Sequence, residues 1–99
     1  MEYKCYICKK AFRSGEKFTF TKEGSVHLDC FVSDKRLKIE ENKIEKLRTL
    51  SLILDYELTY LVELLNIKPE DDESKEITRQ KIKELEKASG ETTKMIYEL

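Results

Sequence analysis

The chain has 99 residues, and 39 % of them are charged. Its 19 Lys and Arg side chains nearly balance 20 Asp and Glu, so the net charge of −1 gives no overall electrostatic reason to bind nucleic acid. A chain of this length buries only about 60 to 65 % of its unfolded surface, which suits one compact unit or a small module with an appendage. It shows neither a signal peptide nor an apolar run of membrane-spanning length, so we expect a cytoplasmic protein without a membrane partner.

The three cysteines and the only histidine stand in two pairs near the amino terminus. Two residues separate Cys5 from Cys8, two separate His27 from Cys30, and eighteen lie between the pairs. This spacing of thiols and imidazole is typical of structural zinc sites. Three cysteines cannot form a fully paired disulfide framework, and zinc needs thiolates, which favours a reducing compartment. We therefore predict one Zn²⁺ per chain, bound by these four residues.

Four protein ligands leave no open position on a tetrahedral ion, so the predicted site is structural rather than catalytic. A redox role for Cys5 and Cys8 is the alternative, but it needs a βαβ context that the surrounding short extended segments do not provide. No pair of nucleophile and base, phosphate-binding glycine loop or carboxylate pair stands out. The sequence thus predicts a protein that is not an enzyme.

A β-hairpin is predicted between the two ligand pairs. Turns are expected around Gly15 and Gly24, and residues 18–21 alternate aromatic and β-branched side chains, as in a strand with one buried face. The second turn returns the chain to the histidine, which brings the ligand pairs together. We expect Phe12, Phe18 and Phe20 to form the small core of this module.

Residues 3–32 resemble the first zinc-binding half of a LIM domain, because they combine Cys-x-x-Cys, a hairpin and His-x-x-Cys-Phe. The segment VHLDCFV at residues 26–32 is similar to that family's segment around its third and fourth ligands. The resemblance implies a treble-clef-like knuckle, hairpin and helix, and it hints at protein binding. A LIM domain continues with four more ligands, whereas this chain has Ser33 where the next cysteine would fall, and Lys9 replaces a frequent glycine. A finger followed by a helical tail also resembles a small family of uncharacterised archaeal proteins, which leaves function open.

The periodicity becomes helical after the finger. Apolar residues at steps of three and four predict one helix from about Leu37 to Asn66, roughly 45 Å long at 1.5 Å per residue. Its apolar face is wider than one neighbouring helix covers, so we expect homodimerisation through this face; alternatively, these side chains form the core of the monomer. The face is built mainly from Ile44, Leu47, Leu54, Leu58, Leu61 and Leu65.

A second helix is predicted after the segment 66–69. Pro69 suits the first turn of a helix, and the acidic run 70–73 suits its amino terminus. Gly90 either stops this helix or lies within it. The predicted fold is therefore α+β, with a zinc-bound hairpin module over residues 1–34 and an antiparallel helical hairpin, the expected dimerisation region, over residues 35–99.

Two functions are consistent with this organisation. In the first, the zinc site supports a protein-interaction or scaffold module. In the second, the finger binds nucleic acid, because residues 1–38 carry nine basic and five acidic side chains, whereas residues 39–99 carry ten and fifteen. The candidate phosphate contacts are Lys9, Lys10, Arg13, Lys17, Lys22, Lys35, Arg36 and Lys38, and the candidate stacking residues are Tyr3, Tyr6 and Phe12.

Overall fold

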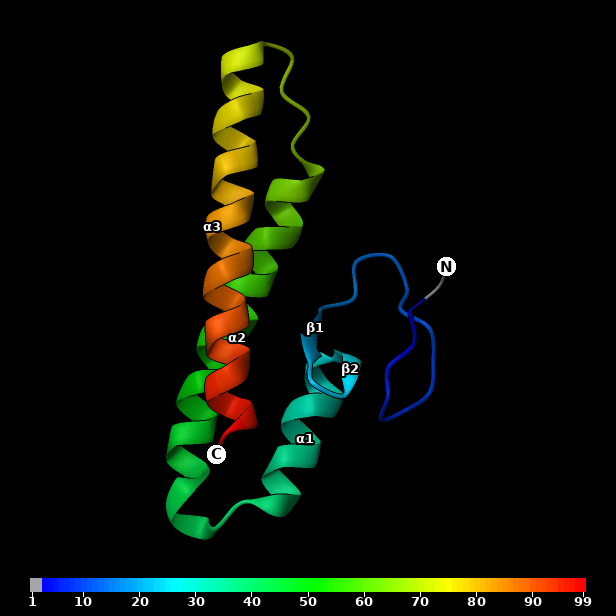
Figure 1. Ribbon diagram of the computed structural model, residues 1–99, viewed down its shortest axis with the longest axis vertical. Helices are drawn as coiled ribbons and strands as arrows, with labels where there is room; N and C mark the ends of the chain where they lie inside the picture. The colour runs from blue at the N-terminus through cyan, green and yellow to red at the C-terminus, as the bar shows by residue number, and fades with distance from the viewer. Residues whose placement is uncertain (1–2) are drawn as a thin grey trace.

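The computed structural model describes residues 3–99. A two-stranded antiparallel hairpin is followed by three α-helices, which confirms the predicted α+β class (Figure 1). The molecule is elongated, with principal extents of 50 × 29 × 19 Å. Within the described residues, no helix is long and apolar enough to cross a membrane. The elements are β1 (Phe18–Thr21), β2 (Gly24–His27), α1 (Leu28–Lys38), a 3₁₀ turn (Glu41–Lys43), α2 (Ile44–Asn66) and α3 (Asp72–Tyr97).

The hairpin leads directly into the first helix. Thr21 pairs with Gly24 next to the turn, and Phe18 pairs with His27 at the open end. Gly24 adopts a φ of 125°, a backbone conformation that side chains with a Cβ rarely allow. Because β2 ends at His27 and α1 begins at the next residue, Cys30 lies within the first helical turn after the histidine.

The strand β1 buries its threonine face rather than its aromatic face. Phe18 is 36 % exposed and Phe20 55 %, whereas Thr19 is buried with its Oγ1 atom 2.7 Å from Oγ1 of Thr93 in α3. The prediction is therefore wrong for Phe18 and Phe20, whereas Phe12 is half-buried and packs against the core. The alternation itself is present, but α3 covers the opposite side of the hairpin, where the two hydroxyl groups bond to each other.

The single helix predicted from Leu37 is interrupted. The helix α1 runs through residue 34, where we expected a module boundary, and ends at Lys38. The chain then turns through Ile39 and Glu40, both in extended conformation, and α2 begins at Ile44. This reversal lays α1 against α2 (Figure 1). No glycine or proline marks the break in the sequence.

The leucines of α2 belong to the core of the monomer. Leu47, Leu50, Leu54 and Leu58 are buried together with Ile96 of α3. The same cluster includes finger residues, namely Cys5, Val26, Leu28 and Phe31. The finger and the helices therefore share one core, and the alternative assignment of these leucines is the one that the fold adopts. Leu65, the last residue of the predicted face, is 58 % exposed.

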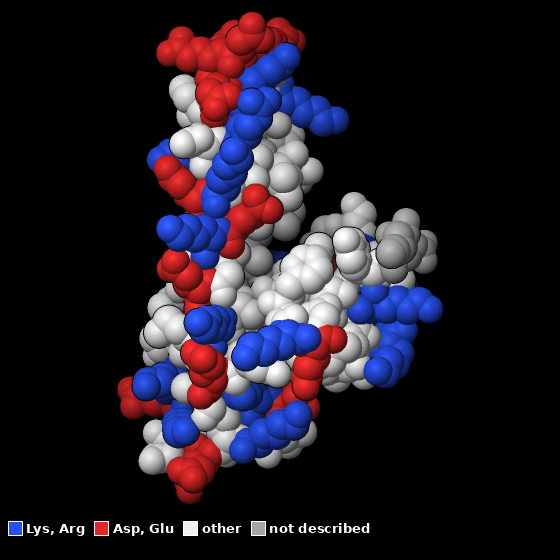
Figure 2. Space-filling model, in the orientation of Figure 1, with Lys and Arg blue, Asp and Glu red and all other residues white. Residues whose placement is uncertain are grey.

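The second helix of the hairpin, α3, begins in the acidic run and continues through Gly90. The side chain of Asp71 caps it by accepting a hydrogen bond from the N–H of Ser74 at 2.7 Å. Because the helix does not stop at Gly90, its last two turns reach the finger and place Thr93 and Ile96 against it. Charged side chains follow the visible face of α3 along its whole length (Figure 2).

Replacing Leu54 with alanine tests the shared core. The side chain of Leu54 is fully buried, so we expect Leu54→Ala to lower the free energy of unfolding by about 2 to 5 kcal/mol. Ile77 provides a matched control, because it is an aliphatic residue on the neighbouring helix α3 but is 56 % exposed. Ile77→Ala should cost less than about 1 kcal/mol in the same urea titration. Equal losses for the two variants would contradict this core.

Candidate metal centre

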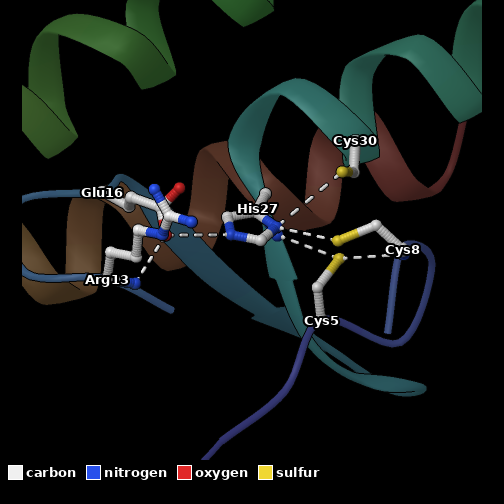
Figure 3. Close-up of polar contacts among 6 residues, drawn as sticks. All are labelled: Cys5, Cys8, Arg13, Glu16, His27 and Cys30. Carbon is white, nitrogen blue, oxygen red and sulfur yellow. Dashed lines mark hydrogen bonds and ion pairs between the residues drawn. The ribbon is translucent and has the colours of Figure 1, made fainter. Parts of the chain in front are cut away.

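Three segments bring the four predicted ligands together. Cys5 and Cys8 come from the amino-terminal knuckle, His27 from the end of β2 and Cys30 from the first turn of α1 (Figure 3). Their candidate ligand atoms all lie within 4.8 Å of one another. The arrangement joins the knuckle, the hairpin and the helix at a single point.

Backbone hydrogen bonds shape the knuckle before any side chain contributes. The N–H of Cys5 donates to the carbonyl of Lys10 at 3.0 Å, and the N–H of Lys9 donates back to the carbonyl of Cys5 at 2.9 Å. This tight turn gives Lys9 a φ of 66°. The left-handed conformation costs a non-glycine residue about 1 to 2 kcal/mol. Glycine would adopt this conformation without that cost.

The surroundings of the Cys5 sulfur favour its thiolate form. It is fully buried and accepts backbone N–H groups from Cys8 and His27, each at 3.5 Å. Burial alone acts to raise the pKa of Cys5, but the backbone donors, including those two, outweigh it and lower the pKa to about 6. Only the thiolate binds a metal, so this environment favours the ligand form.

The surroundings of Cys30 disfavour the thiolate form of its side chain. Burial, followed by the neighbouring sulfurs of Cys5 and Cys8, raises the pKa of Cys30 to about 12. Three thiolates this close repel one another, so the last one ionises only with difficulty. A divalent cation at the centre would reverse this effect, because it attracts all three sulfurs at once.

The imidazole of His27 is held from both sides. Its Nδ1 atom lies 3.4 Å from the sulfur of Cys8 and 3.8 Å from that of Cys30, while Nε2 lies 3.3 Å from Oε1 of Glu16 (Figure 3). Burial acts to lower the pKa of His27, but hydrogen bonds to Cys5 and Glu16 outweigh it and raise the pKa. A carboxylate on the outer nitrogen orients the ring so that the inner nitrogen faces the sulfurs.

Glu16 is a functional residue that the sequence analysis missed. Its carboxylate accepts the backbone N–H of Arg13, and this bond, before the contact with His27, lowers the pKa of Glu16. The sequence indicated only a turn around Gly15. The only sequence signal that could have indicated this role is an acidic side chain in the turn that precedes the hairpin.

The donor set fits zinc. With Zn–S bonds of about 2.3 Å and a Zn–N bond of about 2.0 Å, a tetrahedral ion separates its ligand atoms by roughly 3.5 to 3.8 Å. The distances of 3.4 and 3.8 Å from Nδ1 of His27 to the two sulfurs agree with that separation. The group can therefore hold one metal ion, and three thiolates with one imidazole suit zinc better than a hard cation such as magnesium.

Some of the candidate nucleic-acid-binding residues already have partners within the protein. Three of the lysines are engaged elsewhere: Lys17 pairs with Asp55, Lys38 pairs with Asp34, and Lys35 donates to the carbonyl of Tyr97. Among the candidate stacking residues, Tyr3 is exposed, whereas Tyr6 and Phe12 are half-buried.

Comparison with known proteins identifies one family. Residues 1–98 match the model of a family described as an uncharacterized protein conserved in archaea (DUF2175). The expected resemblance to an archaeal family is thus confirmed, whereas the resemblance to a LIM domain stays a prediction. No curated protein and no solved structure matches the chain.

Glu16→Gln tests the orientation of the histidine. An amide keeps the size of the side chain but loses the charge that strengthens its bond to Nε2, so we expect the affinity for zinc to fall about 10- to 100-fold. Competition with a chromophoric chelator measures this change. Glu23→Gln, in the exposed hairpin turn, is the control and should bind as the wild type does. Unchanged affinity in Glu16→Gln would show that the carboxylate has no part in metal binding.

Proposed function

We propose that this chain, which belongs to the family of uncharacterised archaeal proteins DUF2175, is a non-enzymatic zinc-binding protein that acts as an interaction or scaffold module. The observation that carries the proposal is the convergence of four soft and borderline donors within 4.8 Å. One Zn²⁺ held by Cys5, Cys8, His27 and Cys30 would connect the knuckle, β2 and α1. The reducing conditions of a cytoplasm suit such thiolate ligands.

The position of Cys5 supports a structural role for the ion. Its sulfur is fully buried and lies in the same apolar cluster as Leu54 and Ile96. A ligand at this depth couples metal binding to the packing of the whole molecule. With all four tetrahedral positions taken by protein atoms, none remains for the water that a catalytic zinc activates.

The outer face of α2 supports self-association. Helical geometry places Thr49, Leu52, Ile53, Tyr56 and Tyr60 on the side opposite the buried leucines. No charged residue lies on this face between Thr49 and Tyr60, and Tyr56 is 66 % exposed. Together the four large side chains expose roughly 400 Å² of mostly apolar surface, which is the size of the largest patch on a typical monomer, and such patches are often functional.

A second copy of the chain is the occupant that we propose for this face. Two such faces with their flanking side chains would bury about 1,000 Å², enough for a weak specific dimer. In a dimer with two-fold symmetry, this face would pack against the same face of the second copy. Such a contact needs no charge complementarity, and the face carries no charge that would repel its copy. The homodimer would therefore form through the outer face of α2 rather than through its buried leucines.

Cys8→Ser tests the role of the metal. We expect native mass spectrometry to find one zinc per chain in the wild type and none in the variant. Because metal binding and folding are coupled in small sites, the finger of the variant should lose its dispersed amide signals in NMR spectra. Ser33→Ala, at an exposed position of α1, should keep its zinc. A metal-free Cys8→Ser protein with a native finger spectrum would refute a structural zinc site.

Tyr56→Lys tests the dimer. Two lysines facing each other across a two-fold axis repel, so we expect the variant to be a folded monomer under conditions where the wild type forms dimers. Light scattering combined with size-exclusion chromatography measures the mass over a range of concentrations. Ile77→Lys, an exposed position on α3, should leave the dimer intact. A wild-type protein that stays monomeric at high concentration would overturn the proposed dimer.

A further inference from the structure

Four aromatic side chains of the finger form a continuous row, which we call the aromatic strip: Tyr3, Phe20, Phe18 and Phe12. The ring centroids of successive members lie 5.7, 5.6 and 4.5 Å apart. Phe12 also contacts the imidazole of His27 at 4.6 Å, so the strip begins at the metal centre and runs outward along the hairpin. Tyr3, Phe18 and Phe20 are all exposed, which leaves much of their ring surface open to solvent.

Basic side chains lie beside two members of the aromatic strip. Lys22 and Lys94 line a surface hollow together with Phe20. Lys10 and Arg13 line a second hollow beside Phe12. None of these four cations forms an ion pair with another residue in the range 3–99. Both basic and acidic side chains border the uncharged area of the finger (Figure 2).

Each hollow has one acidic side chain against two basic ones. Glu16 lines the hollow beside Phe12 together with Lys10 and Arg13. Glu98 lines the hollow beside Phe20 together with Lys22 and Lys94. Each hollow therefore keeps an excess of one positive charge for a ligand.

We propose that the aromatic strip binds single-stranded nucleic acid, with bases stacked on its rings and phosphates at the flanking cations. Stacking on aromatic side chains is open to every base, and cations beside the rings follow the sugar–phosphate backbone. Lysine is depleted in protein–protein interfaces, which favours nucleic acid over a protein as the occupant. The inference rests on the proposed zinc site, because the knuckle lies between Tyr3 and Phe12 in the chain.

The experiment measures fluorescence anisotropy of labelled oligouridylate and oligothymidylate of about 15 nucleotides, and of a duplex of equal length, with the zinc-loaded protein. We expect both single strands to bind more tightly than the duplex. If about four phosphates are contacted, the logarithm of the association constant should fall with that of the salt concentration with a slope of about −3.

Phe20→Ala removes an exposed ring without disturbing the core, and we expect it to weaken binding of the single strands at least about ten-fold. Ile77→Ala is the control, because Ile77 is 56 % exposed, like Phe20 at 55 %, but lies in α3 outside the strip. The double variant Lys22→Ala/Lys94→Ala should make the salt slope shallower by about 1.4. Its control, Lys83→Ala/Lys87→Ala, should leave binding unchanged.

Three results would overturn the proposal: no binding to either single strand at about 50 mM salt, where electrostatic attraction is strong; equal affinity for the duplex; or unchanged binding by Phe20→Ala. The first of these would leave the strip to a protein partner. Native mass spectrometry of the same samples separates this failure from that of the zinc proposal. A protein that holds one zinc but binds no oligonucleotide refutes only the nucleic-acid site.

Discussion

The contact between the sulfur of Cys5 and the backbone N–H groups of Cys8 and His27 is the interaction on which the rest of the structure depends. It joins the knuckle to β2, and it does so inside the apolar cluster that also contains Leu54 and Ile96. The electrostatics of the candidate metal centre and the packing of the core therefore act on the same residue. A change in either is transmitted to the other, because both involve the buried side chain of Cys5.

The hairpin uses its two faces for different purposes. Thr19 closes the contact with α3 through a hydroxyl pair, which allows the strand to approach the helix more closely than a phenylalanine would. The opposite face carries Phe18 and Phe20 into solvent, beside the free cations of the finger. A strand whose larger side chains point outward leaves apolar area exposed, and such area usually marks a place where something binds.

The helix α2 also has two distinct sides. Its leucines pack against α3 and the finger, and this packing uses the apolar surface that the sequence left without an obvious partner. The opposite side remains uncharged around Tyr56. By contrast, the exposed side of α3 carries charged residues, with ion pairs at Glu76–Arg79 and Lys81–Glu84. The two helices of the hairpin thus differ in which of them can accept a neighbour.

Local rules determined much of this protein from the sequence alone. The two ligand pairs followed from spacing, the α+β class from the change of hydrophobic period, and the start of α3 from the acidic run after Pro69. Only the tertiary structure decided which face of β1 is buried, where α1 ends, whether the helix passes Gly90 and that Glu16 holds His27. These features depend on groups distant in the chain: Thr19 meets Thr93, 74 residues away, and no local pattern encodes which partner covers a face.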